Sequence, residues 1–474
     1  MRSDTVAAIA TALSDSGIGI IRVSGPEAVE ISDRVFVNKA GKHTMKEWES
    51  HTIHYGFVEE NGEIIDEAMV SLMRAPRSYT TEDTVEFNCH GGVLLLRRVL
   101  EALLRAGARM AEPGEFTKRA FLNGRIDLSE AEAVMDLIQA KNSFALKSSV
   151  RQLRGSVAEE IRCLRAAILY EIAFIESALD DPEHISTEGY PEKLGKVVGE
   201  LLGRMEKLLE SAEDGRLRKE GINTVIVGKP NAGKSSLLNR LVGEEKAIVT
   251  DVAGTTRDVL EESIRLKGIS LNIIDTAGIR TTEDTVEKIG VERAKKYASE
   301  ADLVLYVADS SRKLDESDER IMELLREKKV IVLFNKSDLV PVLTKKDFLE
   351  AFGRTDVPVI FTSAKENRGI DVFEETLEEM FFHGKLPSDN EVVLTNMRHK
   401  EAVQNACDSL KMVRKSLQDG MPEDFYSIDL MSAYTSLGYI IGEEVGDDLL
   451  KILHGKVTEV KNKWHKSEKK WMCA

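Results

Sequence analysis

Residues 222–235 read Ile-Asn-Thr-Val-Ile-Val-Gly-Lys-Pro-Asn-Ala-Gly-Lys-Ser, an apolar run that leads directly into a loop containing two glycines. The pattern predicts a buried strand over 222–227, a phosphate-binding loop, and a helix that begins near Lys234. The glycines let backbone N–H groups turn toward an anion, and Lys234 supplies a point charge to the outer phosphates. The Ser235 hydroxyl can hold Mg²⁺, and the helix N-terminus adds positive potential. These residues predict a nucleotide-binding α/β domain.

Two later segments indicate which base is bound. Asn335-Lys-Ser-Asp338 follows an apolar run, and the Asp338 carboxylate can accept two hydrogen bonds from the N1–H and 2-amino groups of guanine. Adenine has no such donor pair and would leave this carboxylate unpaired. Thr362-Ser-Ala-Lys365 follows a second late apolar run and resembles the base-supporting loop of guanine-nucleotide-binding proteins. The predicted ligand is therefore GTP; an ATPase or a P-loop kinase does not need this guanine-reading pattern.

A third segment, Asp275-Thr-Ala-Gly278, places a carboxylate near the Mg²⁺ shell and the Gly278 N–H near the γ-phosphate. Ras-like GTPases follow this glycine with a glutamine that orients the attacking water, whereas this chain has Ile279. Isoleucine neither donates nor accepts a hydrogen bond, so hydrolysis needs another way to position the water and to neutralise charge. The loop 250–258 is rich in hydroxyls and carbonyls, and with Asn231 it is a candidate site for a monovalent cation.

With these residues in view, the chain resembles the MnmE (TrmE) family of tRNA-modification GTPases, which belongs to the TrmE-Era-EngA-like GTPases. The GTPase motifs are shared with many relatives, so the amino-terminal stretches carry the identification. The matching segments are Gly228–Ser236, Gly254–Asp258, Asp275–Arg280, Gly17–Gly25, Glu86–Gly92 and Pro113–Asn123.

The resemblance implies a potassium site and a magnesium site beside the nucleotide. The implied potassium ligands are the Asn231 side chain, Thr250, Val252 and Thr255, and the implied magnesium ligands are Ser235 and Thr256. Glu287 falls where the catalytic glutamate of the family lies, although an acidic residue in so charged a stretch would otherwise be interpreted as a solvated side chain. The complete predicted GTP-binding set is Asn231, Ala232, Gly233, Lys234, Ser235, Ser236, Thr250, Asp251, Val252, Ala253, Gly254, Thr255, Thr256, Asp275, Thr276, Ala277, Gly278, Asn335, Lys336, Asp338, Ser363, Ala364 and Lys365.

Composition is typical of a multidomain cytoplasmic enzyme. A chain of 474 residues exceeds what one core usually supports, and a net charge of −16 argues against a protein that coats nucleic acid non-specifically. The four cysteines show no paired spacing for zinc or for a disulfide framework. No apolar run reaches membrane-spanning length, and the start has no long apolar segment of a secretory signal. We expect a reducing cytoplasm and no membrane.

Hydrophobic periodicity predicts three domains, one of them split in the sequence. Residues 1–118 mix short strands (19–23, 51–58, 68–73 and 84–88) with helices such as 93–106, which indicates an α+β domain. Residues 119–218 and 384–474 have helical periodicity and flank an α/β segment at 219–383. We therefore predict one discontinuous all-α domain with a Ras-like P-loop GTPase domain inserted into it.

Two details of the first helical stretch are specific. Ser129-Glu-Ala-Glu132 is typical of a capping box that opens a helix. A later helix has an apolar face that we expect to form core, made of Val157, Ile161, Leu164, Ile168, Ile172, Ile175 and Leu179.

The amino-terminal domain resembles the tetrahydrofolate-binding fold, which in this family binds a 5-formyl or methylene derivative and supports formation of a homodimer. By match of motif, Arg22 and Glu86 are folate contacts. Arg125 falls where the family often has a lysine, so a planar guanidinium group replaces the compact ammonium group at this contact. Lys456 corresponds to the family lysine that lies close to the folate.

The carboxyl end departs from the family. Members typically finish with Cys-x-Gly-Lys, whereas this chain has Leu453-His-Gly-Lys456 followed by an extension to Ala474. Leucine cannot act as a thiolate. Either Cys473 takes over, or the modification function has been lost while the GTPase is retained. The extension contains lysines and two tryptophans, which suits either contact with RNA or a solvated tail.

The resemblance implies a potassium-stimulated GTP hydrolase that acts on tRNA with a flavin-containing MnmG (GidA) partner in a heterotetramer. Together they add an aminomethyl or carboxymethylaminomethyl group to position 5 of the wobble uridine. Two alternatives stay open: a GTPase switch in ribosome assembly, and a GTPase that no longer takes part in modification.

Overall fold

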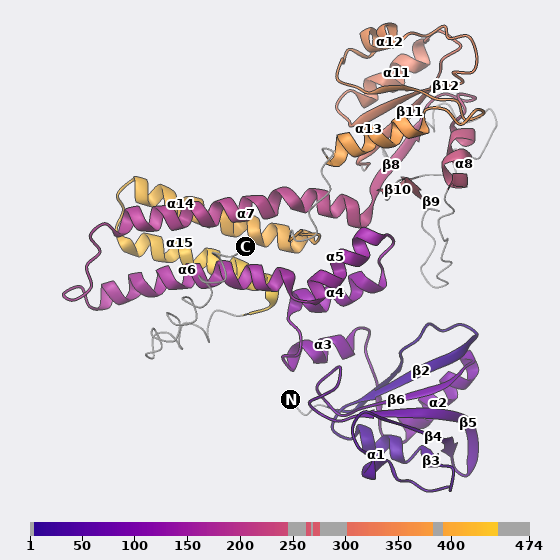
Figure 1. Cartoon of the computed structure of the whole chain (residues 1–474), viewed down its shortest axis with the longest axis vertical. Helices are drawn as coiled ribbons and strands as arrows, with labels where there is room; N and C mark the ends of the chain where they lie inside the picture. The colour runs from indigo at the N-terminus through magenta and orange to yellow at the C-terminus, as the bar shows by residue number, and fades with distance from the viewer. Residues whose placement is uncertain (1–3, 245–261, 267–268, 275–300, 383–391, 444–474) are drawn as a thin grey trace. The chain divides into compact units, whose positions relative to one another are not determined.

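The computed structural model describes residues 4–244, 262–266, 269–274, 301–382 and 392–443 (Figure 1). The chain divides into two compact units. The first comprises Met1–Met135 with Gln152–Ala158, and the second comprises Asp136–Arg151 with Glu159–Ala474.

The first unit contains a seven-stranded sheet in the order β3-β4-β5-β6-β2-β1-β7. Neighbouring strands are antiparallel except for the parallel pair of β1 and β7. Its strands are β1 (Val6–Ile9), β2 (Ser16–Ser24), β3 (Phe36–Asn38), β4 (Thr52–Glu60), β5 (Glu63–Met73), β6 (Thr84–Gly91) and β7 (Arg109–Met110). The four predicted strands lie within β2, β4, β5 and β6, apart from a one-residue difference at the start of β4.

Two helices, α1 (Ala28–Asp33) and α2 (Val93–Arg105), pack on this sheet, and a 3₁₀ turn, η1 (Met45–Glu47), lies beside α1. Side chains alternate between the two faces of β2 and β6, and this alternation decides which of them pack against the helices. Ile21 and Phe87 are fully buried in the core with Leu96 of α2, whereas Arg22 and Glu86 alternate with these residues and stay partly exposed. The predicted α+β character of this domain is confirmed.

Three helices follow the sheet: α3 (Glu115–Leu122), α4 (Leu128–Ile138) and α5 (Ser143–Leu153). The predicted capping box at Ser129 and Glu132 is wrong by two residues. The Asp127 carboxylate accepts from the Glu130 N–H at 3.0 Å, and the Glu130 carboxylate accepts from the Asp127 N–H at 2.9 Å. Helix α4 begins at Leu128, so Asp127 occupies the capping position and Ser129, inside the first turn, donates its hydroxyl to Asp127.

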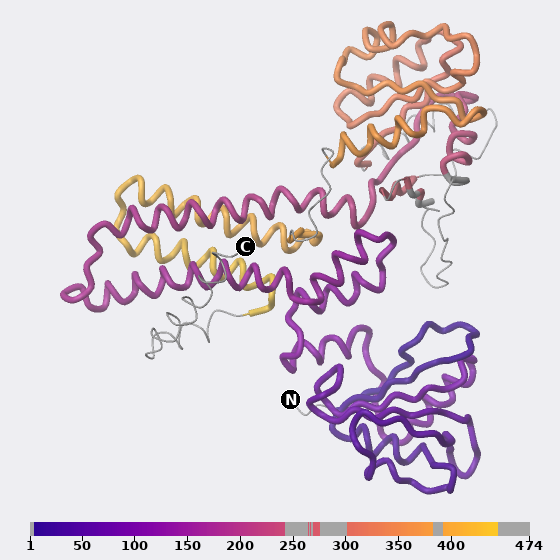
Figure 2. Tube along the Cα trace, viewed as in Figure 1, coloured from indigo at the N-terminus to yellow at the C-terminus, as the bar shows by residue number. Residues whose placement is uncertain are grey.

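The helices on either side of the GTPase segment in the sequence form one helical body. It comprises α6 (Ser156–Asp180), α7 (Tyr190–Glu220), α14 (Met397–Gln418) and α15 (Glu423–Ile441). Helix α14 packs against both α7 and α15, and Figure 2 shows the yellow trace of α14 and α15 alongside the trace of α6 and α7. The discontinuous helical domain is therefore confirmed. Six of the seven predicted core residues of α6 are buried, but Leu179 near its end is 46% exposed.

The second unit also contains a six-stranded sheet in the order β13-β12-β11-β8-β10-β9, parallel except for β9. Its strands are β8 (Ile222–Val227), β9 (Glu262–Leu266), β10 (Ile269–Ile274), β11 (Leu303–Asp309), β12 (Val330–Asn335) and β13 (Val359–Phe361). Helices α8 (Lys234–Glu244) and α13 (Ile370–Phe382) share one hydrophobic cluster with it, and α11 (Glu316–Leu325) and α12 (Lys345–Phe352) share another. This doubly covered parallel sheet confirms the predicted Ras-like α/β domain.

The predicted domain boundaries after residues 118, 218 and 383 stay predictions; α3 and α7 run through the first two. Within the described part of the chain, every helix is too short or too polar to cross a bilayer.

Candidate functional site

The loop between β8 and α8 has a backbone that requires glycine at two positions. Gly228 and Gly233 have φ of +150° and +92°. A Cβ on Gly228 would lie 2.3 Å from the carbonyl oxygen of Val307, and one on Gly233 would lie 2.1 Å from Asn335 Nδ2. Asn231 is also left-handed, with φ of +62°, and its side chain is exposed. The loop is thus held in the conformation that a phosphate cradle needs.

Lys234 begins α8 and folds back over this loop. Its Nζ donates to the carbonyl oxygens of Gly228 at 2.6 Å and Lys229 at 2.7 Å. Burial lowers the pKa of Lys234 to about 8. Ser235 is half-buried and Ser236 exposed in the same first helical turn. The arrangement suits an anionic ligand, because phosphate oxygens would restore the charge stabilisation that burial removes.

Asn335 joins three loops at the carboxyl edge of the sheet. Its Nδ2 donates to the carbonyl oxygen of Ala232 at 3.0 Å, and its Oδ1 accepts from the Ala364 N–H at 3.3 Å. The side chain is almost fully buried. The segments after β8, β12 and β13, predicted separately from the sequence, therefore meet around a single amide.

The predicted guanine-reading residues lie beside this amide. Ser363 donates its hydroxyl to Asp338 Oδ1 at 2.7 Å, and this hydrogen bond holds the pKa of Asp338 below its usual value. Lys336 has a left-handed backbone (φ +60°), and its Nζ pairs with Asp309 at 2.6 Å. Lys365 is exposed.

Asp309 is a residue that sequence reasoning missed. Burial alone would raise its pKa, but the hydrogen bonds from Lys336 and Ser311 outweigh burial and lower it. Its position in the sequence could have indicated it, because Asp309 is the last residue of β11 and the predicted nucleotide motifs also lie at the carboxyl ends of strands.

Part of the predicted site lies outside the described residues. This part comprises Thr250, Asp251, Val252, Ala253, Gly254, Thr255, Thr256, Asp275, Thr276, Ala277, Gly278, Ile279 and Glu287, together with Leu453, Lys456 and Cys473. Of the predicted metal ligands, Asn231 and Ser235 are described, and both lie where the phosphate loop meets α8.

In the first unit, two of the four predicted folate contacts, Arg22 and Arg125, lie against the Tyr79 ring, and a third, Glu86, pairs with Arg22. Arg22 and Glu86 are cross-strand partners, and Arg22 Nε donates to Glu86 Oε1 at 2.7 Å. The Arg22 guanidinium lies 5.4 Å from the centroid of the Tyr79 ring, and that of Arg125 lies 4.9 Å from it. The Phe116 ring, 5.3 Å from Arg22, adds a second apolar surface. Cations, a carboxylate and aromatic rings together suit a flat heterocycle that carries carboxylates.

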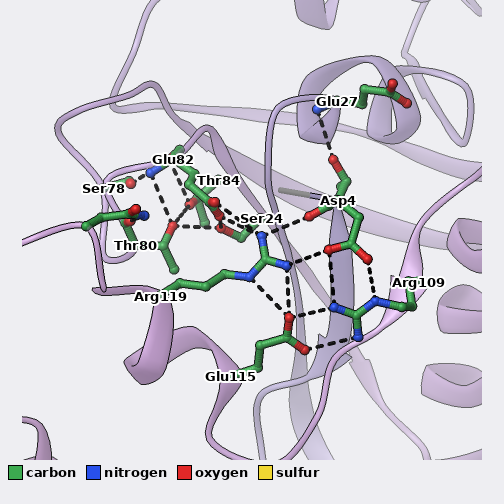
Figure 3. A network of polar contacts seen from close by, with 12 residues as sticks. Asp4, Ser24, Glu27, Ser78, Thr80, Glu82, Thr84, Arg109, Glu115 and Arg119 are labelled. Atoms are coloured by element: carbon green, nitrogen blue, oxygen red, sulfur yellow. Dashed lines mark hydrogen bonds and ion pairs between the residues drawn. The ribbon is translucent and has the colours of Figure 1, made fainter. Parts of the chain in front are cut away.

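A network of ion pairs, buried at Arg119 and Glu115 and exposed at Asp4 and Arg109, holds α3 in place (Figure 3). Arg119 donates to Glu115 at 2.9 Å, to Glu82 at 3.1 Å and to Asp4 at 3.0 Å, while Arg109 bridges Asp4 and Glu115. Burial would raise the pKa of Glu115, but hydrogen bonds from Arg109, the Glu112 N–H and Arg119 lower it to about 2. The Pro113–Asn123 stretch therefore has a structural role that its sequence did not reveal.

The chain matches two family descriptions. Residues 5–125 match the GTP-binding protein TrmE N-terminus, and residues 128–454 match the MnmE helical domain.

Curated relatives match over nearly their whole length. The tRNA modification GTPase MnmE of Lachnoclostridium phytofermentans is 53% identical over 453 residues, which are 96% of this chain and 98% of that protein. The MnmE proteins of Listeria welshimeri and Acetivibrio thermocellus are 47% and 46% identical, with 95% and 96% of this chain covered and 98% of each relative. Among solved structures, the G domain of the T. maritima FeoB iron transporter is 30% identical, with a TM-score of 0.26, and covers 33% of this chain and 97% of that chain.

Proposed function

Because this chain belongs to the MnmE family of tRNA modification GTPases and is a GTP hydrolase, we propose that potassium stimulates its hydrolysis of GTP and that hydrolysis serves modification of the wobble uridine. The supporting observation is the buried Asn335 amide, which brings the phosphate loop and both base-reading loops to one edge of the sheet. Such an arrangement can bind the phosphates and the base of one nucleotide together.

Magnesium is proposed to bind Ser235 and Thr256, and potassium to bind Asn231 with Thr250, Val252 and Thr255. These ions would supply positive charge to the phosphates, with potassium in the place where other GTPases put an arginine finger. Glu287 would orient the attacking water. Among the described residues, Asn231 suits a potassium ligand, because its side chain is exposed within the phosphate loop, on a left-handed backbone.

The amino-terminal unit is proposed to bind 5-formyl- or methylene-tetrahydrofolate through Arg22, Glu86, Arg125 and Lys456. The folate would supply the one-carbon unit of the modification. Tyr79 supports this proposal, because its aromatic ring lies close to both predicted guanidinium contacts, where a pterin would need an apolar surface. Arg22→Met should weaken binding of 5-formyl-tetrahydrofolate in equilibrium dialysis and leave GTP hydrolysis unchanged.

The last part of the proposal is that the chain forms a homodimer and associates with the MnmG (GidA) flavoprotein in the cytoplasm.

The proposed function in modification is tested by measuring position-5-modified wobble uridines in a strain that lacks its own MnmE, with and without this chain. Restored modification supports the full function. Active GTP hydrolysis without restored modification would instead favour a GTPase that has lost this role, which the leucine at 453 makes a specific alternative.

A further inference from the structure

Lys229 is a phosphate-loop residue whose side chain points toward the start of α11. The loop consensus leaves its position open, yet its side chain is only 8% exposed. Its Nζ lies 2.8 Å from Asp318 Oδ2 and also pairs with Asp315, both at the start of α11. A lysine this buried is expected to have a specific partner, and Asp318, only 5% exposed, provides it.

Asp318 is itself held in place from two sides. Tyr306 donates its hydroxyl to Asp318 Oδ1 at 2.8 Å, and the Asp315 N–H donates to Oδ2 at 3.1 Å as part of the capping box of α11. Tyr306 lies on β11 and is the register partner of Val227, the last residue of β8 before the loop. Lys229 is therefore anchored to a rigid helix start and to the neighbouring strand.

The backbone of the same residue faces the phosphate-binding lysine. The Lys229 carbonyl accepts from Lys234 Nζ at 2.7 Å. Lys229 thus contacts α11 through its side chain and contacts Lys234, the predicted phosphate-binding lysine, through its backbone carbonyl.

We propose that Lys229 is a positioning residue, which uses its ion pair with Asp318 to hold the phosphate loop and Lys234 ready for nucleotide. This inference rests on the proposed GTP binding. Because the loop meets phosphates that GDP and GTP share, loss of the ion pair weakens both nucleotides alike. At saturating GTP, kcat stays near that of the wild type, since the interaction is the same in the ground state and the transition state.

The test measures affinity of the full chain for mant-GDP and mant-GTPγS by fluorescence titration. Lys229→Met should raise both Kd values about tenfold or more, the effect of losing a buried charged partner. Lys229→Arg should restore most of the affinity. Lys346→Met removes an exposed lysine from α12 and serves as the matched control, with Kd unchanged.

The double variant Lys229→Met/Asp318→Asn separates positioning from simple charge neutralisation, because it leaves no buried charge unpaired at this site. The other partner of Lys229, Asp315, keeps its charge but is 59% exposed to solvent. We expect its Tm without nucleotide to recover relative to Lys229→Met while its Kd for mant-GDP stays raised. Recovery of affinity together with Tm would overturn the inference, as would unchanged affinity in Lys229→Met. A wild-type chain that fails to bind mant-GDP would overturn the proposed GTP binding itself, and the inference with it.

Discussion

The side-chain amide of Asn335 donates a hydrogen bond to the carbonyl oxygen of Ala232 across 3.0 Å, and this bond joins the base-reading loop to the phosphate loop. The same amide leaves no room for a Cβ on Gly233. The predicted base-reading loop and the predicted phosphate loop are therefore linked through one buried side chain.

Asn335→Asp tests that coupling with a side chain of nearly equal size. The change places a carboxylate oxygen against the Ala232 carbonyl, so a donor is lost and two acceptors oppose each other. We expect affinity for both GDP and GTP to fall about tenfold or more, because buried unpaired groups cost about 1–3 kcal/mol. Isothermal titration calorimetry measures this loss. Asn239→Asp on the exposed surface of α8 is the control, and equal affinities in the two variants would contradict the coupling.

Asp338→Asn should change the preferred base. The asparagine places a donor against the donors of guanine, whereas xanthine has an oxygen where guanine has its 2-amino group. We expect GTP binding to weaken by about 1–3 kcal/mol and xanthosine triphosphate binding to strengthen. Ser363 can still donate to the remaining amide oxygen, so the loop should keep its shape. A variant that still prefers GTP with its original affinity would show that Asp338 does not read the base.

Replacing sodium with potassium at fixed ionic strength should strongly increase the rate of GTP hydrolysis, because Ile279 leaves the site without a water-orienting glutamine. Asn231→Lys should abolish the response. Since Asn231 has a positive φ, Asn231→Gly is the cleaner comparison: it tolerates this backbone and removes only the side chain. Equal wild-type rates in the two salts would exclude a potassium site.

Glu287→Ala should reduce kcat by about 10²-fold or more, the usual contribution of a positioned acid–base group. Affinity for GTP should change little, because Glu287 lies outside the binding motifs. Single-turnover hydrolysis and mant-GTPγS titration measure the two quantities on the same preparation. If affinity fell as far as the rate, Glu287 would have a structural role instead.

The first unit should lose stability in acid through Glu115. Its folded-state pKa of about 2 is below the ordinary value of 4.5, so the carboxylate stabilises the fold above the ordinary value and this contribution is lost as the pH falls toward 2. Glu115→Gln should lower Tm at neutral pH and flatten the fall in Tm between those two values. The fluorescence of Trp48 reports on this unit once Trp464 and Trp471 are replaced by Phe. Glu112→Gln, an exposed neighbour, should leave the curve as it is.

Local patterns in the chain were enough to predict the fold class of each domain and the order of the nucleotide motifs. Apolar residues alternate over 84–88 and recur every three or four residues over 157–175. These patterns reflect which face of the strand or helix is buried, and they can be found in the local sequence alone. The glycines of the phosphate loop are equally local, because their backbone conformations exclude other residues. The capping box was misplaced because two candidate acceptors, Asp127 and Ser129, lie two residues apart.

Long-range contacts were beyond such patterns. The meeting of Asn335 with Ala232 spans 103 residues, and the Arg119 network joins Asp4 to α3 across 115. The guanidinium groups of Arg22 and Arg125 both lie against the Tyr79 ring, although the residues around Tyr79 in the sequence do not indicate a binding role. These pairings arise when strands and helices pack, because packing sets which distant side chains share a buried volume, and a buried charge or amide persists only where such partners meet it.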